Sequence, residues 1–218
     1  MKRLFLIAPL LLTACGGGQL GLSITSDDLG ASVLALDEHT DLTTVRSLKL
    51  TVDEVWVHLA DGDAPAVVQG ADVEEGSEGW LRLTEVDQSL DLMTVRNGAT
   101  LSLGDFSLPA GKVTQIRLKL KPDVALTGGR AYLPGAVVEQ DGSVCDLNLS
   151  ASAFDPGLKL SGSVEAMRIE SGGHHRALIN LNIKDSAKLD GATCAYKLDP
   201  VLKVKHFEPG TGGGGGLL

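Results

Sequence analysis

Cys15 is the residue whose surroundings most clearly predict chemistry. It follows an apolar run from Leu4 to Leu12 and two small residues, Thr13 and Ala14. A short apolar run with a basic start and small residues at its end is typical of a secretory signal peptide. It is too short to cross a bilayer, because a spanning helix needs about 20 apolar residues. The pattern predicts cleavage after residue 14 and acylation of Cys15, with palmitate as a lipid that would label it.

The alternative is a plain signal peptide in which Cys15 is incidental. If Cys15 carries more than one acyl chain, those chains anchor the protein stably at a membrane surface. The next residue is Gly16 and not aspartate, which favours the outer membrane in bacteria that sort lipoproteins by this position. We therefore expect a lipid-anchored protein of the bacterial cell envelope, with the membrane as its partner through the anchor.

Two further cysteines, Cys145 and Cys194, remain after cleavage. In an oxidising envelope compartment, an even number of cysteines predicts a disulfide. The bridge would close a loop of about 50 residues and stabilise the fold by roughly 4 kcal/mol on the chain-entropy model. The alternative is a pair of buried free thiols.

The other candidates for chemistry have less support. Asp61 and Asp63 are weak candidates for Ca²⁺, which takes oxygen ligands, but their segment lacks the spacing of a calcium loop, and solvated acids are the alternative. The adjacent His174 and His175 are too few for a transition-metal site, and solvated turn residues are the alternative. The chain has no G-x-S-x-G, H-E-x-x-H or C-x-x-C motif. We expect no metal, no cofactor and no enzymatic activity; a hydrolase with scattered residues is the least supported alternative.

Charge and composition argue against several classes of partner. The chain has 19 basic and 28 acidic residues and a formal net charge of −9, and cleavage would also remove Lys2 and Arg3. An acidic protein is not expected to bind nucleic acid or anionic lipid head groups. Aromatic residues make up 4% of the chain, which argues against stacking platforms for bases or sugars.

Residues 89–120 organise the predicted fold. Asn97-Gly98 separates two apolar runs, and both residues tolerate the positive φ of a type I′ turn. Residues 108–111, Leu-Pro-Ala-Gly, place proline and glycine where a turn favours them. The following strand alternates polar side chains with an apolar set, which is Ile116, Leu118 and Leu120. These patterns predict a meander of three strands joined by two hairpin turns.

The other apolar runs predict further strands and little or no helix in the mature chain. In Leu48–Leu59 the alternation slips at Asp53-Glu54, which predicts a bulge, and Trp56 is expected in the core. Residues 124–138, with several glycines and a proline, are expected to form a loop with short extended pieces. The predicted organisation is a signal peptide at 1–14, the lipidated cysteine and a flexible tether at 15–19, a single β-sandwich domain at 20–207 and a disordered glycine-rich tail at 208–218.

Several motifs together resemble a known family. Trp80 is followed by SLDLMTVRNG, LPAGKVTQIRLKL, GLKL and YKLDPVLKV, a series that resembles the bacterial lipoprotein family with the domain of unknown function 4382. The resemblance covers most of the mature chain, implies an antiparallel β-sandwich of immunoglobulin or prealbumin type and carries over no active-site residues. The chain departs from the family pattern at Val113, where an aromatic residue is usual, and at residues 152–156. Asn180 and Asn182 replace two aspartates, which argues against a cation role for that segment.

These observations favour a non-catalytic, lipid-anchored envelope protein whose β-sandwich has a structural, adhesive or binding role. The alternative is a glycan- or peptide-binding module. Loops 61–79 and 124–142 are long enough to form a binding surface at one end of the sandwich. The partner would then be an unknown protein or glycan.

Overall fold

The computed structural model of the protein describes residues 17–26, 44–60, 72–73, 79–121, 130–161, 167–182, 187–189, 194–198 and 201–210. The predicted signal peptide, Cys15, Asp61 and Asp63 lie outside these residues, as does most of loop 61–79 and the first part of loop 124–142. Most described residues belong to strands, and helical structure there is limited to 3-10 turns such as Ala151–Ala153. The predicted all-β fold is confirmed, while its immunoglobulin or prealbumin type stays a prediction.

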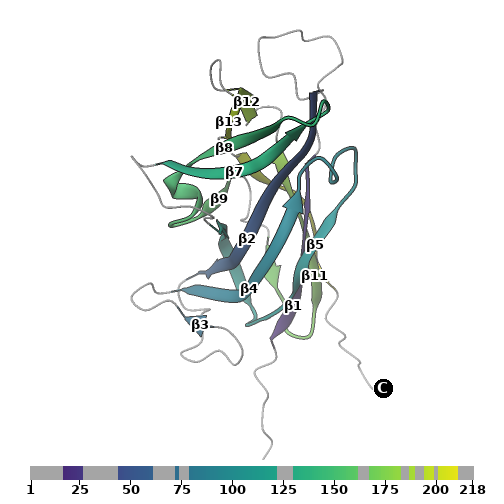
Figure 1. Ribbon diagram of the computed structural model, residues 1–218. Coiled ribbons are helices and arrows are strands. Elements are labelled where there is room, and N and C mark those ends of the chain that lie inside the picture. The colour runs from purple at the N-terminus through teal and green to yellow at the C-terminus, as the bar shows by residue number, and fades with distance from the viewer. Residues whose placement is uncertain are drawn as a thin grey trace, which may run out of the picture.

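One sheet is built around the long strand β2 (Val45–Leu59). β2 pairs antiparallel with β4 (Trp80–Asp91) along one edge (Figure 1) and with β6 (Gly111–Leu120) along the other. Two short strands extend this sheet, β3 (Asp72–Val73) beside β4 and β10 (Arg168–Ile169) beside β6. The register shifts on both edges between Val52 and Glu54, which confirms the predicted bulge. Because the bulge takes up one residue, the apolar side chains before and after it join the same core.

Trp56 is buried, as predicted, but it lies on the opposite face of the sheet from this core cluster, which corrects the face predicted from the sequence. After the bulge, Val55, Val57 and Leu59 point into the core, so the alternating Trp56 points to the other face and its indole contacts Glu54. Alternation counted from the first half of β2 assigned Trp56 to the wrong face, because a shift of one residue exchanges the two faces of a strand.

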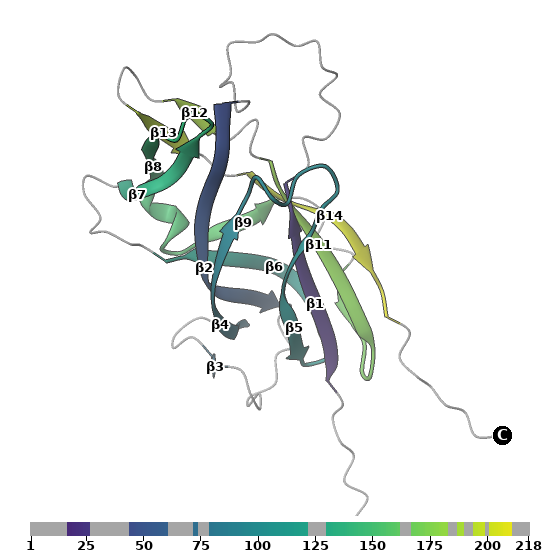
Figure 2. The same ribbon diagram turned by 45° about the vertical axis from the view of Figure 1, so that its right-hand side comes forward.

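The second sheet has the N-terminal strand β1 (Gly18–Thr25) as an inner strand. β1 pairs in parallel with β11 (His174–Asn182) and antiparallel with β5 (Leu101–Leu108). β11 pairs with β14 (Val201–Glu208), and β14 pairs with β9 (Leu158–Ser161), which also pairs with β6. β9 therefore connects the two sheets along one side (Figure 2). One hydrophobic core contains apolar side chains from both sheets.

Four further strands extend the N-terminal half of β2. β7 (Arg130–Glu139) pairs with β2, β8 (Val144–Ser150) with β7, β13 (Ala195–Leu198) with β8, and β12 (Ala187–Leu189) with β13. We call these four strands the distal sheet. The prediction of a loop at residues 124–138 was wrong from Arg130 onward. Gly135, with a φ of 67°, falls at a register shift within β7, so the residues that suggested a loop form an irregularity in a strand.

The predicted meander was wrong, although its first turn has the predicted geometry. Asn97 and Gly98 have φ values of 56° and 86°, and the Ala99 N–H donates to the Arg96 carbonyl at 3.1 Å, as a type I′ turn requires. However, β4 pairs with β2 and β3, β5 pairs with β1, and β6 pairs with β2, β9 and β10. The chain therefore crosses to the other sheet after β4 and returns after β5. The sheets are also mixed and not purely antiparallel, since β1–β11, β14–β9 and β13–β8 are parallel pairs.

The start of β1 and the distal sheet lie at opposite ends of the molecule in both views (Figures 1 and 2). We call the end that contains Gly18 the N-terminal end. It also contains the turns at residues 109–110 and 170–173, because Gly18 pairs with Leu108 and Gln19 pairs with His174. β1 begins inside the range predicted as a tether, and β14 reaches Glu208, the first residue of the predicted tail.

Candidate functional site

Gly17 and Gly18 are packed into the N-terminal end and do not form a flexible tether. The Gly172 N–H donates to the Gly17 carbonyl at 2.9 Å. A Cβ on Gly17 would collide with the Leu108 carbonyl, and one on Gly18 would lie 2.5 Å from the Glu170 carbonyl oxygen. Glycine is needed at both positions because neighbouring backbone approaches too closely for a side chain.

His175 lies inside this end, which corrects its prediction as a solvated turn residue. Its side chain is 1% exposed, and its ring stacks on Phe207 with the centroids 5.8 Å apart. The Glu170 N–H lies 2.9 Å from Nε2, and the Gly210 N–H lies 3.0 Å from Nδ1. A neutral imidazole accepts at one of its nitrogens only, so His175 can satisfy one of these backbone donors at a time. His174, its neighbour, is exposed as predicted.

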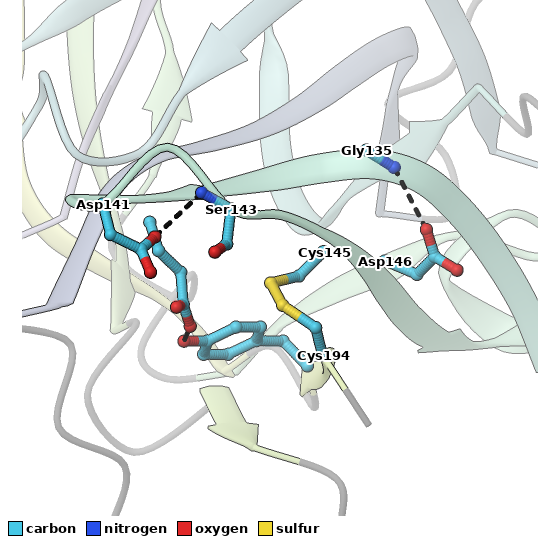
Figure 3. Close-up of a disulfide and its surroundings, with 8 residues drawn as sticks. Gly135, Asp141, Ser143, Cys145, Asp146 and Cys194 are labelled. Carbon is cyan, nitrogen blue, oxygen red and sulfur yellow. Dashed lines mark hydrogen bonds between the residues drawn. A yellow bond between two sulfur atoms is a disulfide. The ribbon is translucent and has the colours of Figure 1, made fainter. Parts of the chain in front are cut away.

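Cys145 and Cys194 lie at disulfide distance and are joined in the distal sheet (Figure 3). Their Cα atoms are 4.8 Å apart, and the two residues are separated by 49 positions in the sequence. Cys145 lies in β8 and is buried, whereas Cys194 directly precedes β13 and is exposed. Because β8 and β13 are paired in parallel, the bridge fastens two neighbouring strands that are far apart in the chain.

Polar side chains around the bridge hold the same region together. The Tyr196 hydroxyl donates to Glu139 Oε1 at 2.6 Å. The Ser143 N–H donates to Asp141 Oδ1 at 2.8 Å, and this hydrogen bond lowers the pKa of the Asp141 carboxyl (Figure 3). The Glu139 carboxylate and the two sulfurs lie within 4.8 Å of one another. A metal would need the sulfurs as thiolates, and the disulfide withholds them, so we interpret this cluster as structural.

The outward face of the β4–β2–β6 sheet carries a cluster of aromatic and charged side chains. Glu54 accepts a hydrogen bond from Trp56 Nε1 at 2.6 Å and forms ion pairs with Arg82 at 3.2 Å and Lys119 at 3.5 Å. Lys119 Nζ also lies 4.7 Å from the centroid of the Trp56 ring. Burial raises the pKa of Glu54, but the hydrogen bonds from Trp56 and Arg82 and the charges of Lys119 and Arg82 outweigh it, so the pKa is lowered from its ordinary 4.5. Glu54 is therefore held as a carboxylate between two cations.

Trp80 continues this cluster at the start of β4. The guanidinium carbon of Arg117 lies 3.9 Å from the centroid of its ring, and the His58 ring packs edge-on against it at 5.0 Å. Trp56 and Trp80 are only 6% and 8% exposed, so they offer no open platform on which a sugar or base could stack. We call this cluster the tryptophan ladder; its members are Glu54, Trp56, His58, Trp80, Arg82, Arg117 and Lys119.

His58 and Thr114 form an imidazole–hydroxyl pair beside the tryptophan ladder. His58 Nδ1 lies 2.5 Å from Thr114 Oγ1, and the Thr114 hydroxyl donates to the His58 carbonyl at 3.1 Å. Because that hydroxyl proton is already committed, we assign Nδ1 as the donor in the first contact. Nucleophilic catalysis needs the opposite arrangement, with the ring nitrogen accepting the hydroxyl proton. These hydrogen bonds therefore indicate that His58 and Thr114 join β2 to β6, and they favour this structural role over a catalytic one.

Sequence reasoning missed the tryptophan ladder and the buried place of His175. A signal for the ladder was present, because Glu54, Trp56 and His58 alternate along one strand and so share a face once the bulge is allowed for. His175 had no such local signal. Its partners come from the preceding turn and from Gly210, and only the tertiary fold brings them together.

Among the described residues, no helix has the length and apolar character needed to cross a bilayer. Comparison with curated proteins and with solved structures finds no match. A family model described as Domain of unknown function (DUF4382) matches residues 32–200. This range contains the tryptophan ladder and both bridged cysteines but leaves out β1 and β14. The chain belongs to the DUF4382 family.

Proposed function

We propose that this protein is a non-catalytic, lipid-anchored protein of the bacterial cell envelope whose β-sandwich domain has a structural, adhesive or binding role. The observation that carries the proposal is the position of Cys15, three residues before Gly18, where β1 begins as an inner strand of a sheet. Acyl chains on that cysteine would hold the folded body at a membrane with almost no intervening linker.

Two further features support this proposal. The bridge between Cys145 and Cys194 fits an oxidising envelope compartment, where disulfides persist. The charged groups of the tryptophan ladder are engaged with one another: Glu54 pairs with Arg82 and Lys119, which suits a role in holding strands together better than a role in chemistry.

Metabolic labelling with radioactive palmitate tests the anchor. The wild-type protein is expected to carry the label and to sediment with membranes, and Cys15→Ala is expected to lose the label. The double variant Cys145→Ala/Cys194→Ala is the matched control, since it removes two cysteines and should keep the label. Full labelling of Cys15→Ala would contradict the proposal.

The outer membrane is the proposed destination, because Gly16 follows the cysteine. In a host that sorts lipoproteins by this residue, density-gradient separation should place the wild-type protein in the outer-membrane fraction. Gly16→Asp should move it to the inner-membrane fraction. Wild-type protein found in the inner membrane of such a host would contradict this part of the proposal.

Binding of a glycan or peptide at the distal end is a second candidate. The exposed turn at residues 140–143 overlaps the end of the range 124–142 and connects β7 to β8 in a sheet that a disulfide fastens. A rigid scaffold that presents an exposed turn is a common arrangement for recognition. Glycan and peptide arrays probed with the mature chain test this candidate. A signal that falls in Asp141→Ala would support it, and a signal no higher than that of an unrelated β-sandwich would contradict it.

A further inference from the structure

We propose that the N-terminal end of the body rests on the bilayer, with phospholipid head groups as its partner, so that the distal sheet points away from the membrane. This inference deepens the proposed function and rests on the lipid anchor at Cys15.

The connection from Cys15 to the folded body is too short to let the body turn over. The Gly17 carbonyl already accepts a hydrogen bond from Gly172, and the Gln19 N–H donates to the Gly173 carbonyl at 2.8 Å. Consecutive Cα atoms are about 3.8 Å apart, so Gly17 lies within about 8 Å of Cys15. The polar head-group layer on each side of a bilayer has a similar thickness, roughly 5–8 Å. The first fixed residue of the body therefore lies at the level of the head groups.

β1 cannot lengthen this connection by leaving the sheet. It is paired along both edges, with β5 and with β11, and Leu20, Leu22 and Ile24 are buried in the core. Gly18 is also enclosed between the Glu170 carbonyl and the Ile169 side chain. Release of even the first residues of β1 would break backbone hydrogen bonds to two strands and would detach the turn at 170–173. The orientation of the body is therefore fixed by the fold.

The surface of the N-terminal end suits contact with head groups. Its two turns present small uncharged residues, Ala110 in one and Ser171-Gly172 in the other, and all three are exposed.

The charged residues beside these turns are three cations and three carboxylates, which are Lys112, Arg168, Arg176, Asp105, Glu170 and Glu208. Arg168 and Arg176 are exposed, and an arginine guanidinium matches the geometry of a phosphate. The charges at this end therefore balance, whereas the chain as a whole has a net negative charge that argues against contact with anionic lipids.

Depth-dependent quenching of fluorescence tests the orientation in the full chain. A fluorescent amino acid is incorporated at Ser171, at the N-terminal end, or at Gln140, beside the exposed turn of the distal sheet. The lipidated protein is reconstituted into vesicles of phosphatidylethanolamine and phosphatidylglycerol that carry a nitroxide on the head group. We expect the probe at position 171 to be quenched several-fold more strongly than the probe at position 140.

A lengthened connection is the matched control. A flexible Gly/Ser insertion of about 20 residues after Gly16 has a root-mean-square length of about 25 Å, and it should remove most of the difference while leaving the protein anchored. Equal quenching at the two positions in lipidated wild-type protein would overturn the proposed orientation alone. Mass spectrometry of the N-terminal peptide shows whether Cys15 carries lipid. Protein recovered without lipid on Cys15 would overturn the proposed function and, with it, this contact.

Discussion

Glu54 shows how a single carboxylate can tie three strands together. It lies on β2 and is bonded to Trp56 on the same strand, to Arg82 on β4 and to Lys119 on β6. The two cations come from opposite edges of β2, so the charge of Glu54 links both neighbouring strands across it. The lysine also lies over the indole ring that donates to Glu54. The stability of this face is therefore expected to depend on one ionised group.

Replacing Glu54 by glutamine should separate the charge from the hydrogen bond, since glutamine still offers an acceptor to Trp56. We expect the free energy of unfolding at neutral pH to fall by about 1 kcal/mol, because the ion pairs are partly exposed to solvent. The folded state lowers the pKa of Glu54 from 4.5, so its contribution is complete above that value and is lost as the pH falls through the folded pKa. Urea titrations should show a gap between wild type and Glu54→Gln that narrows below pH 4.5.

The ion pair between Asp87 and Lys121 supplies the control. It joins β4 to Lys121, the residue that follows β6, with 2.8 Å between the charged atoms, but both side chains are exposed to solvent. Such pairs contribute little, so Asp87→Asn should change stability by less than about 0.5 kcal/mol. Equal losses in the two variants would contradict a specific role for Glu54.

His175 gives a second test at the same scale. His175→Phe keeps a ring beside Phe207 but removes the acceptor that faces the backbone N–H groups of Glu170 and Gly210. A buried donor without an acceptor costs about 1–3 kcal/mol, and we expect a loss of that size in urea denaturation. His174→Phe changes the adjacent exposed residue and should stay within about 0.5 kcal/mol. Similar losses of stability in both variants would contradict a role for His175 as a buried hydrogen-bond acceptor.

Strand β1 can occupy its position because it starts with glycine, which has no side chain. Gly18 allows the chain to pass beneath the turn at 170–173 and to pair at once with β5 and β11. A run of three glycines in the sequence suggests flexibility, but the fold uses two of them for close approach. The same glycines therefore predict flexibility when the sequence is considered alone, and they permit close backbone packing once the partners of β1 are known.

Gly18→Ala is expected to destabilise the fold by about 1–3 kcal/mol, as overpacking of a core does. The added Cβ would lie 2.5 Å from the Glu170 carbonyl oxygen and 2.7 Å from Ile169 Cγ2, and the backbone oxygen can yield only if the turn moves. Gly21→Ala, on the same strand, is the control. Its Cβ would meet the end of the Asp105 side chain, which can rotate away. Thermal denaturation that shows an equal shift in the two variants would contradict this explanation.

Local patterns predicted the elements of this protein better than their partners. The turn at Asn97-Gly98, the bulge at Asp53 and the buried set at Ile116, Leu118 and Leu120 all follow from short-range chemistry, and all are observed. The meander was wrong because the choice of neighbour depends on which apolar faces meet across the core, and no local pattern encodes it. The cysteine pair could be predicted, because it needs only an even number of cysteines and an oxidising compartment. The tryptophan ladder could not, because its contacts depend on the register between β4, β2 and β6.

On the scale of the whole molecule, the two ends differ in how they are held. The N-terminal end is closed by backbone hydrogen bonds around Gly17 and by His175. The distal sheet, in contrast, is fastened by the bridge between Cys145 and Cys194 and by the hydrogen bond from Tyr196 to Glu139. Under the proposed anchoring, the covalent fastening is therefore at the end that points away from the membrane.

Removal of the bridge should cost more than any single substitution considered above. Cys145→Ala/Cys194→Ala frees a loop of about 50 residues in the unfolded chain, and we expect a loss of about 4 kcal/mol on the chain-entropy model. Urea denaturation of the oxidised wild type, the reduced wild type and the double variant checks this expectation. Reduced wild type should resemble the double variant. A reduced protein as stable as the oxidised one would contradict a stabilising role for the disulfide.

Because β1 is an inner strand, it can pair fully only after both of its neighbouring strands have been synthesised. β1 is synthesised before its neighbours, yet β5 begins at Leu101 and β11 begins only at His174. Pairings between such distant segments form slowly. Until β11 has been synthesised, β1 has no parallel partner, and its apolar side chains can associate with other unfinished chains. We therefore expect unfinished chains to be prone to aggregation for most of the synthesis of this protein.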